Sequence, residues 1–312
     1  MGGLGYRESL NVLESAWNAG IRHFDVAPAY GYGEAEGCLG EFMRRHQGQM
    51  TVTTKFGIPP AAGGSLGRIV RSVGRTAVRQ FPGLKQRLSK ASPPAASASF
   101  PPAKEVSQAP RPPNPIFCVE EAKKSLYRSL AAFQSERIDV WLLHEVTASD
   151  LHDEKLLRFL EDSVRSGVIG TFGAGTDRNH IDDLLDLRPD YCPTLQYEWS
   201  IFDPLPRGAN VFRMHHRSLT GNFRSLHAAL SADKDRSSRW SELVGADLSD
   251  AVILAKLMLK AALLLNPESV ILFSSKSTGH IEANVALASD DSLSDAALTL
   301  YRVLQAEMIS SD

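Results

Sequence analysis

Short apolar runs rich in β-branched residues alternate along the chain with stretches whose apolar residues recur every three or four positions. In Val119–Phe133, for example, the apolar residues at 119, 122, 126, 130 and 133 fall on one helical face. Runs such as VWLLH and VILF contain no alternating polar positions, which is typical of strands buried on both faces of a parallel sheet. The pattern therefore predicts an α/β protein.

The periodicity predicts seven strands and seven helices. The strands span Ile21–Ala27, Met50–Phe56, Ile138–His144, Val168–Ala174, Thr194–Trp199, Asn210–His215 and Ser269–Ser274. The helices span Tyr6–Ala19, Glu34–His46, Val119–Phe133, Leu156–Arg165, His180–Asp186, Asp250–Leu265 and His280–Ala288. Repeated βα units form either a doubly wound sheet or a (β/α)8 barrel. A barrel needs an eighth strand ahead of Tyr6, where MGGLG stands, so we expect most or all of a first strand to be lacking.

The segment 58–118 differs in composition from the rest of the chain. It holds eleven of the 17 prolines, and its nine Lys and Arg face one acid, Glu105. Proline at this density blocks helices and sheet ladders, so we expect an insertion that is partly disordered. Within it, Leu66–Gln80 carries arginines at helical spacing, at positions 68, 71, 75 and 79. Such a basic helix fits a solvated face, a lid over an anionic ligand or a membrane-surface contact.

Composition narrows the classes of function. The net charge of −2 gives no general attraction to nucleic acid or to anionic membranes. The three cysteines are scattered and form no CxxC pair, which predicts neither a disulfide framework nor a thiolate metal site. The most apolar run, Ala251–Leu265, is shorter than the ~20 residues that span a membrane. With no secretory signal in MGGLGYRESL, we expect a cytoplasmic protein without a nucleic-acid partner or membrane span, whose oligomeric state stays open.

Polar residues end three consecutive predicted strands. IRHFD ends in Asp25, TVTTK in Lys55 and IDVWLLH in His144, and Tyr30 lies in the loop after Asp25. Each alone fits a structural role, as a cap, a solvated strand end, a core histidine or a loop aromatic. The carboxyl ends of barrel strands converge on one mouth, however, and burying all four groups there without a function costs desolvation energy. We therefore interpret the four as one site.

These four residue types suit carbonyl reduction. We expect Asp25 to keep Lys55 charged and Lys55 to lower the pKa of Tyr30, because an adjacent ammonium stabilises a phenolate. Tyr30 is then the general acid, and His144 holds the carbonyl oxygen between itself and Tyr30. No metal is required, and the hydride must come from a cofactor. The expected reaction converts a small aldehyde or ketone to an alcohol.

The segment 20–36, GIRHFDVAPAYGYGEAE, resembles the signature GxRhfDtAxxYGxGxsE of the aldo-keto reductases, and TTKFG and IDVWLLHE follow at the spacing of that family. The resemblance covers about 1–57 and 117–290. It implies a (β/α)8 TIM barrel with its first strand truncated, as a single domain over 1–312, in which 58–118 replaces a short loop. The family's catalytic tetrad falls on Asp25, Tyr30, Lys55 and His144.

The resemblance also implies a cofactor site. It places a nicotinamide against Gln196 and Trp199, and a pyrophosphate near Arg217 and Ser218. The loop SSKS before the last predicted helix has hydroxyls and an ammonium at a helix N-terminus, which is typical of a phosphate site and favours the 2′-phosphate of NADPH. The residues expected at NADPH are Thr176, Gln196, Trp199, Arg217, Ser218, Ser275, Lys276, Ser277, His280 and Asn284.

Two other functions fit the same residues. One is a non-catalytic, nicotinamide-binding regulatory subunit that senses redox state, as the potassium-channel β subunits do. The other is a truncated, inactive homologue. Turnover with NADPH separates both from a reductase.

Overall fold

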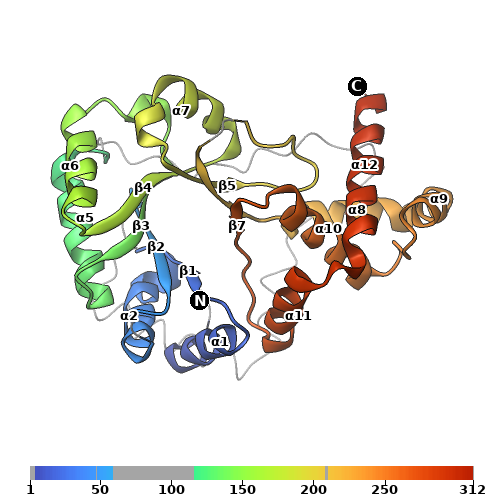
Figure 1. Ribbon diagram of the computed structural model, residues 1–312, viewed down its shortest axis with the longest axis horizontal. Helices are drawn as coiled ribbons and strands as arrows, with labels where there is room; N and C mark the ends of the chain where they lie inside the picture. The colour runs from blue at the N-terminus through green and yellow to red at the C-terminus, as the bar shows by residue number, and fades with distance from the viewer. Residues whose placement is uncertain (1–3, 47, 59–115, 208–209, 312) are drawn as a thin grey trace, which may run out of the picture.

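The alternation of strands and helices predicted above is present in the computed structural model, which describes residues 4–46, 48–58, 116–207 and 210–311. In these residues, seven parallel strands form one curled sheet in chain order (Figure 1). They are β1 (His23–Asp25), β2 (Thr51–Phe56), β3 (Ile138–His144), β4 (Ile169–Gly175), β5 (Thr194–Glu198), β6 (Phe212–His216) and β7 (Ser269–Ile271). Most of the segment 58–118, including Leu66–Gln80, lies outside the described residues. Its status as an insertion in a single domain stays a prediction.

Helices surround the outer face of the sheet, as Figure 1 shows for α2, α5 and α6. Those predicted are α1 (Tyr6–Asn18), α2 (Ala35–Arg45), α5 (Val119–Phe133), α6 (Glu154–Arg165), α7 (Ile181–Leu187), α10 (Ala251–Leu265) and α11 (Thr278–Ser289). The side chains of these helices and the outward-facing strand residues form the main hydrophobic core. No helix among the described residues is long and apolar enough to cross a membrane.

The apolar periodicity does not predict three further helices, α8 (Thr220–Ala232), α9 (Lys234–Val244) and α12 (Ser294–Ser311). They lie to one side of the sheet with α10 (Figure 1) and bury a second cluster that includes Trp240, Leu257 and Leu300. The sequence of α9, KDRSSRWSELV, shows why they are hard to predict: its apolar residues are few and pack on other helices. Tertiary contacts, more than local periodicity, stabilise such helices.

Successive side chains of a strand point alternately into the barrel interior and outward to the surrounding helices. In β3, Val140 and Leu142 point into the barrel, where they pack with Met214 of β6. Trp141 and Leu143 point outward and join the helix-facing core. Because successive strand residues face opposite sides, the parity of each position decides whether its side chain reaches the barrel interior.

The ring of strands is open between β1 and β7. Among the described residues, β1 pairs only with β2 and β7 only with β6, so these two edges do not pair with each other. The outer layer does close at this place, because α1 contacts α11 and Ser15 Oγ lies 3.1 Å from Thr278 Oγ1. The prediction of a barrel lacking one strand is thereby confirmed.

Candidate functional site

A buried lysine and an acid form the centre of the site. Lys55 Nζ donates to Asp25 Oδ1 at 2.6 Å and Oδ2 at 2.7 Å, and to the carbonyl of Val26 at 3.0 Å. The parallel register of β1 and β2 produces this contact, because it places Asp25 opposite Thr53. Lys55 lies two residues after Thr53, so its side chain faces the barrel interior on the same side as Asp25. Lys55 is only 2% exposed, so the carboxylate of Asp25 compensates a buried charge.

The phenol and the imidazole lie at the same rim. Tyr30 begins the 3-10 helix η1 (Tyr30–Gly33), and His144 ends β3. Their rings meet edge to face, with centroids 6.1 Å apart, and Lys55 Nζ lies 5.2 Å from the centre of the Tyr30 ring. Gly57 has φ of 135°, and a Cβ there would approach His144 O to 2.7 Å, so glycine permits the turn that ends this part of the rim.

The electrostatics of Tyr30 differ from the expectation. The sequence predicts that Lys55 lowers the pKa of this phenol, but burial and the carboxylates of Asp25 and Glu145 raise it to about 12. Burial is the largest cause of the rise, and the ammonium of Lys55, which is paired at 2.6 Å with Asp25, does not overcome it. Arg217 is the cation that opposes the rise. Tyr30 therefore holds its proton throughout the neutral range.

His144 is a neutral imidazole. Burial, followed by the charges of Lys55 and His216, lowers its pKa to about 3. Its Nδ1 is buried and has no hydrogen-bond partner in the structure. A neutral ring carries one N–H donor, which can face an oxygen that gains negative charge without adding a cation to the pocket.

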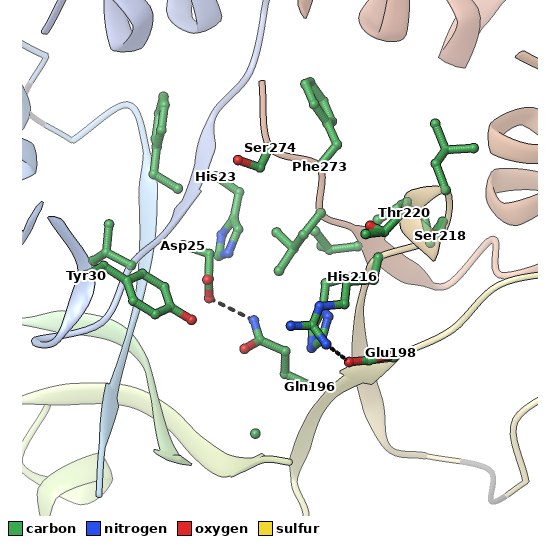
Figure 2. Close-up of a pocket in the computed structure, with 18 of the residues that line it drawn as sticks. His23, Asp25, Tyr30, Gln196, Glu198, His216, Ser218, Thr220, Phe273 and Ser274 are labelled. Carbon is green, nitrogen blue, oxygen red and sulfur yellow. Dashed lines mark hydrogen bonds and ion pairs between the residues drawn. The ribbon is translucent and has the colours of Figure 1, made fainter. Parts of the chain in front are cut away.

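Gln196 reaches across the barrel to the acid. Its Nε2 donates to Asp25 Oδ2 at 2.7 Å, which joins β5 to β1 (Figure 2). The side chain lines the same cavity as Tyr30 and His144. One N–H of its amide is thus already engaged, which leaves the other N–H and the amide oxygen for a ligand such as a carboxamide.

Trp199 does not reach the cavity, which corrects the expectation that its ring faces the nicotinamide. The side chain is fully buried, and its Nε1 donates to Pro204 O at 3.0 Å. The cause is strand parity: Trp199 shares the outward side of Tyr197, whereas Gln196 faces inward. On β6 the inward residue is His216, whose imidazole points into the cavity (Figure 2).

The cavity has a volume of about 1590 Å³ and extends from the tetrad to the loop between β7 and α11. Predicted cofactor residues that line it are Thr176, Gln196, Arg217, Ser218, Ser275, His280 and Asn284. Lys276 and Ser277 precede α11 outside the lining. Lys276 is exposed, and Ser277 Oγ caps the helix by accepting from the His280 backbone at 3.4 Å.

The wall beside β6 offers free hydrogen-bonding groups. Ser218 is 4% exposed and lines the cavity, and its buried Oγ has no hydrogen-bond partner among the described residues. The next helix, α8, begins two residues later, and no side chain caps its N-terminus. Unpaired amides at a helix start, an unpartnered hydroxyl and the Arg217 guanidinium suit an anion such as a pyrophosphate. The residues present therefore fit the diphosphate of a nicotinamide dinucleotide.

Several lining residues were absent from the predicted set. His23 lies one layer below Asp25, and its ring nitrogens contact Thr51 Oγ1 at 2.8 Å and Thr53 Oγ1 at 3.1 Å. Glu198 and His216 end neighbouring strands and face the cavity. Residues two apart on a strand face the same side, so His23 lies on the side of Asp25 and Glu198 on the side of Gln196. This alternation along the strand is the sequence signal that identifies both residues.

Two curated proteins match part of the chain. A pyridoxal 4-dehydrogenase from Microbacterium luteolum is 46% identical over 46 residues, which cover 15% of this chain and 14% of that protein. A D-threo-aldose 1-dehydrogenase from Pseudomonas sp is 47% identical over 51 residues, which cover 16% of each. The matches thus span less than a fifth of the length of either relative.

Solved structures share the fold over most of the chain. An aldo-keto reductase from Bacillus halodurans in its holo form superposes with a TM-score of 0.61 at 16% identity, covering 96% of this chain and 88% of that one. An aldo-keto reductase from Klebsiella pneumoniae in complex with NADPH gives a TM-score of 0.57 at 15% identity, covering 97% and 88%. The family model described as Aldo/keto reductase family matches residues 2–214. The chain therefore belongs to the aldo/keto reductase family.

Proposed function

We propose that this protein is an NADPH-dependent oxidoreductase that reduces an aldehyde or ketone to an alcohol, with Tyr30 as the general acid. The observation that carries the proposal is the Asp25–Lys55 pair, held at 2.6 Å beneath the rings of Tyr30 and His144 at one rim of the cavity. Membership of the aldo/keto reductase family supports it.

The roles follow from the geometry. His144, neutral because its pKa is lowered to about 3, donates a hydrogen bond to the carbonyl oxygen and holds it near the Tyr30 hydroxyl. Asp25 keeps Lys55 charged and in place, although burial lowers the pKa of that lysine. The positive charge of Lys55 near the Tyr30 ring stabilises the phenolate as the proton leaves.

The raised pKa of Tyr30 favours reduction over oxidation. With a pKa of about 12, the phenol is protonated at neutral pH and has a proton to give. The oxygen of a carbonyl that gains hydride becomes an alkoxide, which is a stronger base than a phenolate, so transfer from Tyr30 is downhill. Oxidation would require the phenolate first, which this environment disfavours.

The cofactor would occupy the long cavity. Its pyrophosphate would meet Arg217, Ser218 and the start of α8, and its adenosine would lie toward Ser275, His280 and Asn284. NADPH supplies the hydride when bound. Lys276, exposed before α11, would pair with the 2′-phosphate from outside the cavity lining. The NADPH complex of the Klebsiella pneumoniae structure supports this choice of cofactor.

The names of the two curated relatives suggest the first substrates to try. One is named as a dehydrogenase of pyridoxal and the other as a dehydrogenase of a D-threo-aldose, and both of these compounds contain a polar aldehyde. Polar groups at the tetrad end of the cavity, including Glu145, Ser149 and His152, suit hydroxylated substrates of this kind. We therefore propose a small polar aldehyde or ketone as substrate.

Turnover tests the proposal directly. NADPH absorbance is followed with pyridoxal, D-aldoses, simple aldehydes, ketones and quinones, and binding of NADPH is measured separately by its fluorescence. The proposal expects NADPH to bind and at least one carbonyl to be reduced. Binding without any turnover would instead support the regulatory-subunit function, and the absence of both would contradict the cofactor assignment.

A further inference from the structure

An ion pair lies inside the cavity beside the groups that would meet the cofactor. Glu198 is the last residue of β5, and Arg217 directly follows the end of β6. These two strands pair with each other, and Glu198 lies opposite His216. The Arg217 guanidinium donates to the Glu198 carboxylate, and both side chains line the cavity. Figure 2 labels Glu198 and marks this ion pair with a dashed line. The two are 52% and 37% exposed, so the pair is within reach of a ligand.

The backbone directs Arg217 toward this partner. Its φ is 59°, a left-handed conformation that residues with a Cβ rarely adopt, and it comes directly after the last strand residue, His216. His216 O still accepts from the Trp199 backbone at 3.2 Å, so the strand pairing holds up to this turn. A non-glycine residue in this conformation at a ligand cavity is typical of a position under functional constraint.

The pair stands next to the anion-accepting wall. Ser218 is the next residue, and α8 follows it. In the part of the chain that the structure describes, the buried hydroxyl of Ser218 has no partner and no side chain caps the N-terminus of α8. An anion that approaches Ser218 and α8 thus meets Arg217 already neutralised by Glu198. The carboxylate occupies the guanidinium and offsets its positive charge.

We infer that Glu198 is a positioning residue that competes with the phosphates of the cofactor for Arg217, and so limits affinity and speeds cofactor release. This rests on the proposed function. An ion pair that is about half exposed is weak, because solvent screens it. The guanidinium can therefore exchange the carboxylate for a diphosphate, which accepts two parallel hydrogen bonds and carries more charge.

Glu198→Gln tests the inference in the full-length chain. The amide keeps the size of the side chain and removes its charge, so Arg217 becomes free for the anion. We expect NADP+ and NADPH each to bind about threefold to tenfold more tightly, in fluorescence titration, with a matching decrease in the dissociation rate by stopped flow. The salt dependence of binding becomes steeper, because one more cation is available to the phosphates.

Arg217 supplies the second arm of the experiment. Arg217→Met alone should weaken binding, and Glu198→Gln should have no further effect in the Arg217→Met background, because Glu198 acts through the arginine. Asp162→Asn is the matched control. It breaks the comparable exposed pair with Arg165 on α6, far from the cavity lining, and should leave the dissociation constants unchanged. Melting temperatures check that each variant is folded.

The outcomes distinguish a failure of this inference from a failure of the proposed function. If wild-type protein binds neither nucleotide, the proposed function fails and the inference with it. If wild-type protein binds NADPH while Glu198→Gln binds equally or more weakly, only the inference is overturned. It is also overturned if the gain from Glu198→Gln persists without Arg217, since Glu198 would then act on the cofactor directly. Should Glu198→Gln fail to fold, Glu198→Ala, which also removes the carboxylate, gives the same comparison.

Discussion

The amide of Gln196 donates to Oδ2 of Asp25 at 2.7 Å, which links two residues on opposite sides of the barrel. Asp25 therefore accepts from Lys55 and from Gln196 at once. The link connects the proposed proton-transfer site to the residue expected at the nicotinamide, so the two halves of the site hold each other in place.

Gln196→Glu should destabilise the protein more at pH 8 than at pH 5. A second carboxylate would lie about as close to Asp25 as the amide does now, and two such groups cannot both ionise without repulsion, which raises the pKa of the pair. Stability is then lost as pH rises through that raised pKa. We expect a decrease of about 1–3 kcal/mol in the free energy of unfolding at pH 8. Gln196→Met, which loses the hydrogen bond but adds no charge, should show equal losses at both pH values.

Tyr30→Phe should reduce kcat by more than ~10²-fold, because the ring stays but the proton donor is lost. Affinity for NADPH should change little, as measured by fluorescence titration. Tyr32→Phe is a matched control, since Tyr32 lies in the same 3-10 helix but does not line the cavity. Full activity in Tyr30→Phe would mean that another group donates the proton.

Lys276→Glu should weaken the binding of NADPH more than that of NADH. Only NADPH carries a 2′-phosphate, and Lys276 is an exposed cation at the start of α11. Dissociation constants for both nucleotides give the ratio. Equal losses for the two would assign Lys276 to a general electrostatic effect rather than to the 2′-phosphate.

His215 should make the fold sensitive to acid. It is fully buried between Tyr197 and Trp199, and burial, with Arg213 nearby, lowers its pKa from 6.5 to about 4. The unfolded chain binds the proton more readily, so this contribution to stability is complete above pH 6.5 and is lost as pH falls toward 4. His215→Phe keeps a ring of similar shape and removes the titration.

The slope of unfolding free energy against pH, from urea titrations between pH 7 and 4.5, should therefore be smaller in His215→Phe than in wild type. His227→Phe on α8 serves as the control, because its ring stacks on Phe223 away from this core. Parallel slopes for all three proteins would show that other groups cause the acid sensitivity.

The open edges of β1 and β7 should limit stability. Their outer backbone groups have no strand partner among the described residues, and apolar side chains such as Val270 and Leu272 line the cavity beside the opening. Adding a strand-forming segment ahead of Tyr6 should raise the melting temperature by a few degrees and sharpen the transition. An extension of equal length made of Gly and Ser should not. Equal melting curves would show that the α1–α11 contact already closes the barrel sufficiently.

Local sequence determined most of the secondary structure. The bounds of α5 and β3 follow directly from the apolar spacing of 119–133 and from the unbroken run IDVWLLH, because each pattern matches one regular geometry. The sequence also determined that Asp25, Lys55 and His144 lie at or next to the carboxyl ends of parallel strands, and strands that run the same way bring these ends to one rim. The close approach of these residues follows from the parallel strand order, which the alternation of strands and helices in the sequence already predicts.

Tertiary structure alone decided the rest. Parity at the end of β5 buries Trp199 and leaves His216 as the ring in the cavity. Burial of Tyr30, together with the carboxylates of Asp25 and Glu145, reverses the expected pKa shift of that phenol. Helices α8, α9 and α12 depend on burial against one another. Each of these results depends on which distant groups come within a few ångströms, since burial and Coulomb interactions act through space and not along the chain.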